Sequence, residues 1–379
     1  MATQGKGADA GVRVTTGRAL TAVLVALFLT LATGARPADG ASPATPAAPV
    51  PPGPPKVTVN GQPVSWDLPP FMFEGLLVVP LKSLAEPLDY TYQWDSTARR
   101  TTVKRGAREV SFAPGSRRYI SEGEGHFAGT PGKIVDGRLC VSLRFLAQAL
   151  DVGLTFEPEA GVVDLDPARP YTAVARKPRP GYVAYITIDD GPAPDTPAML
   201  DVLARYKAPA TFFIIGGMAK LRPEMVKRIV AEGHALGNHT FHHAHEPKQA
   251  SWCLRSVEAY LAELDACDRL IADITGLHPR ATRAPGGSRP HLTAEFRKAL
   301  DELGYIDFMW NVSTGDSAWP RPTPDQMLDA VVERSWNGKM IDPIILIHDG
   351  VSKHRQTVEA LPAIIEYLRY AGYTLGTLP

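Results

Sequence analysis

Two aspartates and two histidines have types and spacings that suit metal-assisted hydrolysis. Asp189 and Asp190 are adjacent, at the end of a strand-like run that starts at Tyr185. His239 and His243 are spaced i and i+4, which would place both imidazoles on one face of a helical turn. One carboxylate and two imidazoles form a ligand set that suits zinc and leaves a position open for water. The second carboxylate would then be free to act as a base.

Neither pair is decisive alone, because Asp-Gly-Pro is also turn chemistry and structural histidines are common. Two further segments strengthen the interpretation. Arg283–Gly287 reads Arg-Ala-Pro-Gly-Gly, and Leu346–His348 reads Leu-Ile-His. Arg283 adds a cation that can pair with a carboxylate, and His348 adds a third imidazole. The combination favours a catalytic site over four unrelated structural features.

The elements that must position these residues lie in the region 181–379, where strand-like and helix-like segments alternate. The expected strands are 182–188, 210–215, 305–311, 343–347 and 373–377, and the expected helices are 196–206, 222–232, 252–274, 292–303, 323–335 and 355–371. This alternation predicts parallel βαβ units in a sheet buried on both faces. A barrel or a doubly wound sheet follows, and in both folds active groups gather at the carboxyl ends of the strands.

Residues 56–166 contain an internal repeat and predict a smaller N-terminal α+β domain. The segment 75–89 matches 137–151 at an offset of 62, and the match continues through Trp94 and Phe156. Each copy predicts a short strand, a helix of two to three turns and a strand pair. The pattern resembles the copper-amine-oxidase-type stalk domain of exported bacterial wall proteins.

Composition and charge limit the function classes. The formal net charge is zero, which argues against a dedicated nucleic-acid binder, and a hydrophobic content of 44% provides ample core. The three cysteines are too few for a disulfide framework, and we expect Cys140, Cys253 and Cys267 to be buried hydrophobic residues, the last two on one long helix. A basic cluster in the N-terminal domain could contact an anionic wall polymer, although a solvated strand face is the simpler interpretation. It comprises Arg99, Arg100, Lys104, Arg105, Arg108, Arg117 and Arg118.

The N-terminal residues predict export. Residues 1–35 are interpreted as a signal peptide or signal anchor, because basic residues precede an apolar stretch, Ala19 to Leu31, that is short for a membrane span of about 20 residues. Residues 36–55 form a Pro/Ala-rich linker, and 167–180 form a second linker. We therefore expect an extracellular or cell-wall-associated protein, which an uncleaved N-terminal segment would tether to the membrane.

In combination and order, the motifs of the region from about residue 185 to the end resemble those of the polysaccharide deacetylase family (carbohydrate esterase family four, the NodB-homology domain). Thr187–Pro192 resembles the first motif, and His239–His243 matches the second, His-Ser/Thr-x-x-His. Arg283–Gly287 resembles the third motif and Ile345–Asp349 the fifth. The resemblance implies the α/β class with a distorted (β/α) barrel, and metal-dependent removal of N- or O-acetyl groups from sugars.

The resemblance also implies how water would be activated. Asp190, His239 and His243 would hold a divalent metal, most simply Zn²⁺, although Co²⁺, Ni²⁺ and Mn²⁺ accept the same donors. Asp189 would be the general base that takes a proton from water, and Arg283 would fix its orientation.

The implied acid and substrate contacts lie in the later motifs. His348 would protonate the departing amine, and Asp316 would orient His348. Leu346 would line the pocket for the acetyl methyl, and a backbone N–H near Gly286 would stabilise the oxyanion. The remaining predicted substrate contacts are Pro285 and Trp319.

Two motifs depart from the family pattern. Gly286 stands where the third motif has an aromatic residue, so one aromatic wall of the substrate groove is missing. In the fourth motif, Asp-x-x-Asp-Trp, the first aspartate is Ser313 and the tryptophan is Ser317, while Asp316 is retained and Trp319 follows two residues on. These changes concern substrate shape and full activity more than the metal site.

The sequence therefore predicts an exported, metal-dependent deacetylase of N-acetylglucosamine-containing polysaccharide, with peptidoglycan as the expected substrate and no nucleic-acid partner. One alternative is a deacetylase of chitin-like oligosaccharide or xylan. Another is a non-catalytic cell-wall-binding protein on a decayed deacetylase fold, which the changes at Ser313, Ser317 and Gly286 would favour. Retention of every proposed metal, base and acid position favours the enzyme.

Overall fold

The computed structural model describes residues 54–73, 76–129, 132–157, 159–172, 178–243, 252–288, 292–350 and 355–379. The predicted signal segment and nearly all of the first linker lie outside these ranges, as do residues 173–177 of the second linker. Within the described ranges, no helix is both long enough and apolar enough to cross a membrane.

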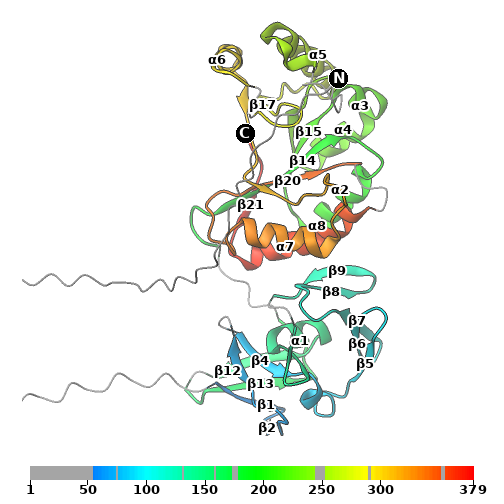
Figure 1. The fold of residues 1–379 in the computed structure, drawn as a ribbon, viewed down its shortest axis with the longest axis vertical. Coiled ribbons are helices and arrows are strands. Elements are labelled where there is room, and N and C mark those ends of the chain that lie inside the picture. The colour runs from blue at the N-terminus through cyan, green and yellow to red at the C-terminus, as the bar shows by residue number, and fades with distance from the viewer. Residues whose placement is uncertain are drawn as a thin grey trace, which may run out of the picture. The chain divides into compact units, whose positions relative to one another are not determined.

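The C-terminal region is an α/β domain built on an eight-stranded sheet in which the paired strands are parallel (Figure 1). The strand order is β18-β17-β16-β15-β14-β20-β19, and β21 pairs with β14. The strands are β14 (Val183–Gly191), β15 (Thr211–Ile214), β16 (Ala235–Asn238), β17 (Ala281–Thr282), β18 (Ile306–Asp307), β19 (Val312–Ser313), β20 (Ile344–His348) and β21 (Thr374–Gly376). The α/β class and the distorted (β/α) barrel are thus confirmed, with end strands of only two residues.

Helices connect these strands and cover the sheet. They are α2 (Thr196–Tyr206), α3 (Gly216–Leu221), α4 (Pro223–Ala231), α5 (Val257–Thr275), α6 (Ala294–Glu302), α7 (Pro324–Arg334) and α8 (Gln356–Tyr370), with a short 3₁₀ helix η2 (Trp252–Arg255) before α5. In Figure 1, α7 and α8 lie side by side against one another. The central strands are apolar on both faces, because the adjacent residues Phe212 and Phe213 of β15, and Leu346 and Ile347 of β20, point to opposite faces and are at most 4% exposed. This burial explains their continuous apolar sequence.

Five of the six predicted helices of this domain are confirmed to within two residues, and the sixth, 252–274, divides into η2 and α5. Several short elements were not predicted. The strand expected at 305–311 forms only as β18, and the predicted remainder of it is wrong, because an irregular segment follows Asp307. The sequence of β16, Ala-Leu-Gly-Asn, lacks the β-branched residues typical of strands. Its Gly237 is required, because a Cβ there would lie 2.5 Å from the Phe213 ring.

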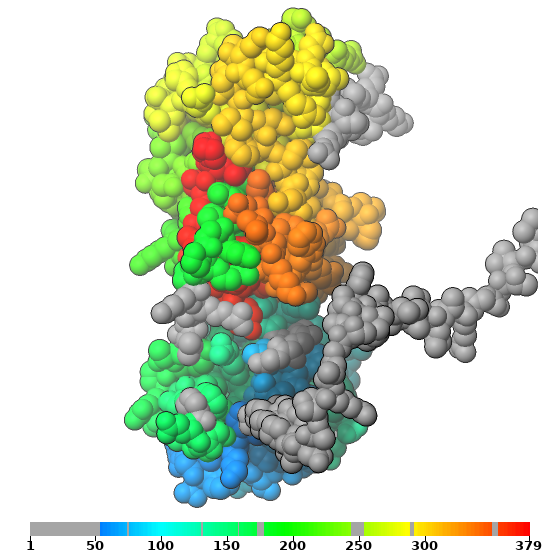
Figure 2. Space-filling view, turned by 90° about the vertical axis from the view of Figure 1, so that its left-hand side faces the viewer, coloured from blue at the N-terminus to red at the C-terminus, as the bar shows by residue number. Residues whose placement is uncertain are grey.

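The last strand closes onto the start of the first. The Thr374 amide donates to the Tyr182 carbonyl at 3.0 Å, and the Arg179 amide donates to the Gly372 carbonyl at 2.9 Å. Figure 2 shows these C-terminal residues (red) at the surface, next to the segment that leads into β14 (green).

The N-terminal domain is rich in β structure. Its strands form three sheets, with orders β12-β13-β1-β2, β10-β11-β4-β3 and β5-β6-β7-β8-β9. The elements are β1 (Lys56–Val59), β2 (Gln62–Pro63), β3 (Phe71–Phe73), β4 (Leu76–Pro80), η1 (Lys82–Leu84), β5 (Thr91–Asp95), β6 (Arg100–Arg105), β7 (Arg108–Phe112), β8 (Arg118–Ser121), β9 (Glu124–Phe127), β10 (Lys133–Val135), β11 (Arg138–Ser142), α1 (Leu143–Leu150), β12 (Gly153–Glu157) and β13 (Val162–Asp166).

The two copies of the repeat meet about a pseudo-two-fold axis. β4 and β11 pair antiparallel with Val79 opposite Val141, which are equivalent positions in the two copies. The predicted strand pairs also form, as β5 with β6 and β12 with β13.

The predicted helix forms in the second copy only. In the first copy the chain makes only the 3₁₀ turn η1, so the predicted helix is wrong there. Pro87 of the first copy stands where the second has Ala149, and a proline at this position disrupts helical hydrogen bonding. Ser142 caps α1 by accepting the Phe145 amide at 3.1 Å, whereas the first copy has Pro80 there.

The β8–β9 hairpin packs on α7 and α8. Arg117 and Arg118 pair with Asp329 and Asp325 of α7 at 2.9 and 3.2 Å. Phe127, 7% exposed, lies in the same hydrophobic cluster as the α8 side chains. Part of the basic cluster seen in the sequence is therefore neutralised by carboxylates far along the chain.

Two of the three cysteines are confirmed as buried free thiols, Cys140 and Cys267. Cys253 lies in η2 and Cys267 in α5, so the expectation that they share one helix is wrong. Ser256 interrupts the helical segment in an extended conformation and caps α5, with its hydroxyl accepting the Ala259 amide. The Cys253 side chain lies outside the described residues.

Candidate active site

A β-bulge turns both aspartates of the first motif toward the same side. Successive residues of a regular strand point to opposite faces, so two adjacent carboxylates would normally diverge. In β14, Asp189 pairs with Phe213 and Gly191 with Ile214, which leaves Asp190 unpaired in a bulge with φ of 74°. Such bulges re-aim a side chain. The Nε2 atom of His239 consequently lies 3.8 Å from Asp189 Oδ2 and 3.4 Å from Asp190 Oδ1.

The two histidines are held by a loop, so the predicted helical turn is wrong. His239 follows directly after β16, and Thr240 and His243 have φ values of 68° and 47°. Asn238 Oδ1 accepts the Thr240 amide, and Thr240 Oγ1 accepts the His243 amide, at 3.0 and 3.2 Å. These side-chain hydrogen bonds compete with helical ones and explain why the i, i+4 spacing does not become a helix.

Glu263 of α5 supports this loop, and the sequence interpretation missed it. Its Oε2 accepts the amides of Phe241 and His242 at 3.1 and 2.8 Å, and its Oε1 lies 2.9 Å from His242 Nδ1. Glu263 is 5% exposed. A usable signal exists in the sequence, because this carboxylate interrupts the apolar face that Tyr260, Leu264 and Cys267 form on α5.

We predict that Glu263→Ala lowers the affinity for metal about 10- to 100-fold, the usual cost of losing a group that orients metal ligands. Without the carboxylate, two amides of the loop, those of Phe241 and His242, lose their acceptor, and the loop that carries His243 loses its anchor on α5. Titration of the apo protein with Zn²⁺ measures the effect. Asp273→Ala, at an exposed position of the same helix, is the matched control and should bind metal like the wild type.

Three donors converge in a metal-type cluster. One ligand atom each from Asp190, His239 and His243 lies within 4.8 Å of the others. His239 Nδ1 lies 2.7 Å from the Arg283 carbonyl, so the N–H is directed there and Nε2 is left facing the carboxylates. Asp190 Oδ1 is buried and has no hydrogen-bond partner among the described residues. A buried orphan acceptor between two imidazoles is what a cation would satisfy.

The charges of the site also favour a cation. Burial opposes the ionised form of Asp190, but the contact with His239 and the charge of the nearby imidazoles outweigh it and lower its pKa to about 2. Burial likewise opposes protonation of His239, yet the charge of Asp189 and the contact with Asp190 raise its pKa. A largely buried carboxylate that stays ionised beside two imidazoles attracts a divalent ion.

Arg283 anchors the base. Its side chain is 0% exposed, and its Nη1 donates to Asp189 Oδ1 at 2.6 Å and to Thr187 Oγ1 at 3.0 Å. Its Nε donates to the Phe308 carbonyl at 2.8 Å, and the guanidinium lies 4.0 Å from the centre of the Phe213 ring. These fixed contacts leave Asp189 a single orientation, with its second oxygen turned toward His239.

His348 and Asp316 form the second ion pair of the site. His348 Nδ1 lies 2.8 Å from Asp316 Oδ1, and the His348 amide donates to Asp316 Oδ2 at 2.7 Å. Burial opposes the charge on His348, but the hydrogen bond and the charge of Asp316 outweigh it. Together with the charges of Asp189 and Asp190, they raise the pKa of His348 to about 9. His348 is therefore protonated at neutral pH in the metal-free site, as a general acid requires.

The other predicted site residues differ in their surroundings. Leu346 is buried on β20, and Pro285 is buried beside the exposed Gly286. Gly286 has a φ of 73°, and a Cβ there would meet no atom within 4 Å, so the place of the family's aromatic side chain is open. Trp319 is 89% exposed, and no contact between it and the site is found among the described residues. The predicted role of Trp319 stays a prediction.

The altered fourth motif keeps its local turn. Ser313 Oγ accepts the Gly315 amide at 3.1 Å, a contact that an aspartate could also make. Thr314 Oγ1 accepts the Asp316 amide at 3.4 Å, which positions the retained carboxylate below His348. The change at Ser313 therefore leaves the His348–Asp316 pair intact.

Asp349, the residue after His348, makes contacts that stabilise the fold. Its Oδ2 accepts the Ala193 amide at 3.1 Å and the Thr196 hydroxyl, at the start of α2. Burial raises the pKa of this carboxyl group to about 6. Asp349 fixes the first turn after the bulge rather than facing the metal-type donors.

An α/β barrel with one metal-type cluster, a paired carboxylate and a paired imidazole at its strand ends defines a hydrolase. Residues 176–306 match the family model described as polysaccharide deacetylase, and residues 58–165 match the copper amine oxidase N-terminal domain. The chain belongs to the polysaccharide deacetylase family, and both resemblances stated from the sequence are confirmed.

Named relatives share the C-terminal half of the chain. A chitooligosaccharide deacetylase of Sinorhizobium fredii is 37% identical over 208 residues, which cover 52% of this chain and 89% of that protein. A peptidoglycan-N-acetylglucosamine deacetylase of Bacillus cereus is 34% identical, with 51% and 84% covered. A solved polysaccharide deacetylase from Bacillus cereus is 34% identical, covering 52% of this chain and 92% of that one, with a TM-score of 0.46. By family, the protein is a carbohydrate-active hydrolase of the deacetylase type.

Proposed function

We propose that this protein hydrolyses the N-acetyl groups of N-acetylglucosamine units in peptidoglycan, releasing acetate, with Zn²⁺ held by Asp190, His239 and His243. The observation that carries the proposal is the convergence of three metal-type donors with two oriented ion pairs, Arg283–Asp189 and Asp316–His348. In each ion pair, a buried partner fixes one group that can transfer a proton: Arg283 fixes Asp189, and Asp316 fixes His348.

The residues divide the work of amide hydrolysis between them. A bound divalent cation would polarise the acetyl carbonyl and lower the pKa of water. Asp189, held by Arg283, accepts the proton that water loses as it attacks. His348 holds a proton through Asp316 and delivers it to the nitrogen of the departing sugar amine, which is a poor leaving group without protonation. Two groups with opposite roles are thus fixed before substrate arrives.

Peptidoglycan is proposed as the substrate, and the protein is proposed to act outside the cell. The export-type N-terminal segment and the domain that resembles wall-protein stalks support this location. Relatives named as peptidoglycan-N-acetylglucosamine deacetylases support the sugar. The relative named chitooligosaccharide deacetylase, at 37% identity, supports the second candidate, a shorter N-acetylglucosamine oligomer.

Acetate release from purified peptidoglycan tests the proposal. After dialysis against a chelator we expect release to fall to the background rate, because the water-activating cation is lost. One equivalent of Zn²⁺ should restore it. Chitooligosaccharide is assayed in parallel to distinguish the two substrates. Undiminished release after complete metal removal would contradict the metal-dependent mechanism, and zinc binding without release from either glycan would favour the decayed, wall-binding alternative.

A further inference from the structure

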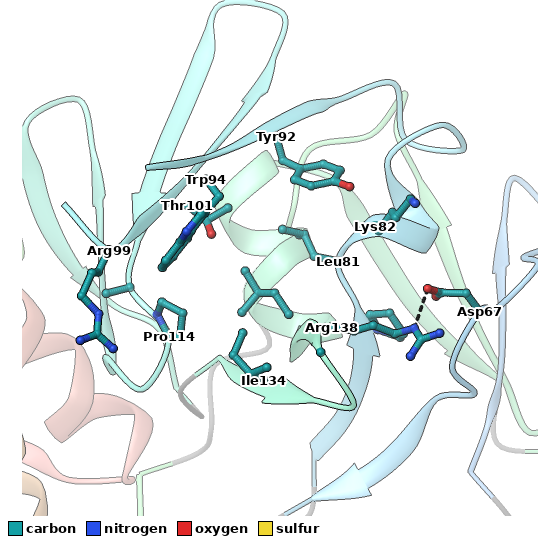
Figure 3. Close-up of a pocket in the computed structure, with 14 residues that line it drawn as sticks. Asp67, Leu81, Lys82, Tyr92, Trp94, Arg99, Thr101, Pro114, Ile134 and Arg138 are labelled. Carbon is teal, nitrogen blue, oxygen red and sulfur yellow. Dashed lines mark hydrogen bonds and ion pairs between the residues drawn. The ribbon is translucent and has the colours of Figure 1, made fainter. Parts of the chain in front are cut away.

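The N-terminal domain carries a groove of about 730 Å³ whose lining residues all belong to this domain (Figure 3). A volume of this order accommodates a small ligand or a few units of a polymer. Its apolar lining includes Leu81, Pro114 and Ile134. Tyr92 and Trp94 stand along one side in the close-up view. The groove combines apolar walls with charged groups at its rim, as ligand sites commonly do.

The two aromatic rings are exposed on a face where their neighbours are buried. Tyr92 and Trp94 lie two residues apart on β5, so their side chains share one face of the sheet. The residues opposite them on β6, Val103 and Thr101, are 1% and 2% exposed. On the next strand, β7, Phe112 lies opposite Thr101 and is 2% exposed.

The side chains on this face of β6 and β7 therefore point into the domain and are buried. On the edge strand β5, the same face is exposed. Tyr92 and Trp94 are 42% and 49% exposed. Two large rings left uncovered side by side form an apolar surface of the kind that marks a binding site.

The charges at the rim are mostly positive. Lys82, Arg99 and Arg138 line the groove, with Asp67 as the single carboxylate. Asp67 is already used, because it accepts Arg138 Nε at 2.7 Å and the Ser83 hydroxyl at 2.7 Å. Among the described residues, no carboxylate forms an ion pair with Lys82 or Arg99.

Arg99 also stands apart from the rest of the basic cluster identified in the sequence. The other members donate to protein groups: Arg100 to Ser111, Lys104 to Glu109, Arg105 to the Leu88 and Pro167 carbonyls, Arg108 to the Ala149 carbonyl, and Arg117 and Arg118 to α7. Among the described residues, no hydrogen bond or ion pair is found for the Arg99 side chain, and Arg99 is the member of the cluster that lines the groove. Its position indicates a ligand with negative charge.

We propose that this groove binds a carboxylate-bearing, N-acetylated glycan strand, and that it anchors the polymer on which the catalytic domain acts. The proposal rests on the proposed function for the polymer class. A pyranose ring has apolar faces that stack on aromatic rings and polar edges that hydrogen-bond. Tyr92 and Trp94 would receive such faces. The apolar side chains of Leu81 and Ile134 would contact acetamido methyls, and Arg99 and Lys82 would pair with carboxylates carried by the strand.

The chain offers a matched control for the test. Phe156 is the repeat equivalent of Trp94, lies on β12 and is 53% exposed, yet does not line the groove. Trp94→Ala and Phe156→Ala therefore remove similarly exposed rings from equivalent strands. Both are made in the full chain carrying Asp189→Asn, so that the glycan is not altered during the measurement.

Binding is measured with soluble glycan fragments of purified peptidoglycan, with neutral chitin oligomers, and by co-sedimentation with insoluble peptidoglycan. We expect Trp94→Ala to raise Kd for the fragments at least about tenfold, the typical effect of removing an aromatic anchor that becomes buried on binding, and Phe156→Ala to leave Kd unchanged. Arg99→Gln should weaken binding of the carboxylate-bearing fragments and leave binding of the neutral oligomers unchanged.

Three results would overturn the proposal: unchanged binding by Trp94→Ala, an equal loss in Phe156→Ala, or competition by free stem peptides or single-stranded DNA but not by glycan. The readout is independent of the proposed function, because it records binding without turnover. If the chain with Asp189 intact released no acetate from any glycan while Trp94-dependent binding persisted, the catalytic proposal would fail and the groove would stand.

Discussion

Replacing Asp189 by asparagine is expected to lower kcat for acetate release by about 10²- to 10⁴-fold while the protein still binds one equivalent of metal. This range is the usual contribution of a positioned general base. Asparagine keeps the shape of the side chain but cannot accept the proton from water. The contacts of Arg283 with Thr187 and the Phe308 carbonyl persist, so the site should keep its geometry.

The neighbouring residue gives the matched comparison. Asp190→Asn changes the carboxylate that lies 3.2 Å from His243 Nε2, and it should lose both metal and activity. Metal content and acetate release measured on the same samples separate the two variants. If Asp189→Asn lost its metal as Asp190→Asn does, the assignment of base and ligand would have to be reversed or abandoned.

The sequence was informative where function requires several residue types in order. The four motif segments lie far apart in the chain, yet the structure brings Asp189, Asp190, His239, Arg283 and His348 to one edge of the sheet. Parallel βαβ topology explains this, because the carboxyl ends of all strands meet at the same edge. The fold class followed from the same alternation of apolar strands and helices.

What the sequence did not predict depends on local hydrogen bonds. The i, i+4 spacing of His239 and His243 suggested a helix, but Asn238 and Thr240 tie their own backbone into a loop instead. The bulge at Asp190 also leaves no periodic signature, since it is a shift of register against β15. In the N-terminal repeat, by contrast, Pro87 was visible in the sequence and could have excluded the first helix.

Tertiary placement explains the remaining differences. The groove in the N-terminal domain arises because Tyr92 and Trp94 occupy the edge strand of a sheet whose other inward residues are covered. The alternation of side chains along β5 gives no indication of which face is covered, since all five of its residues are exposed. Such a surface becomes visible only when strand order and neighbouring contacts are known.

Replacing Asp316 by asparagine is expected to move the alkaline limb of the kcat/KM profile to lower pH by at least about one unit. The limb reports deprotonation of the acid, so activity is present below the pKa of His348 and is lost as pH rises through it. In the wild type, burial opposes the charged imidazole, and Asp316 supplies the largest opposing effect that raises its pKa to about 9. Asparagine removes that charge while burial remains, so the pKa falls.

A cation held near Asp190 adds positive charge and lowers the pKa of His348 in both proteins, so the difference between their profiles is the quantity to measure. The profiles are recorded at saturating Zn²⁺, with Asp273→Asn as an exposed control that should leave the limb in place. His348→Asn should abolish the alkaline limb and lower kcat about 10²-fold or more, because no proton reaches the leaving amine. An alkaline limb that stays in place in Asp316→Asn would show that a group other than His348 supplies that proton.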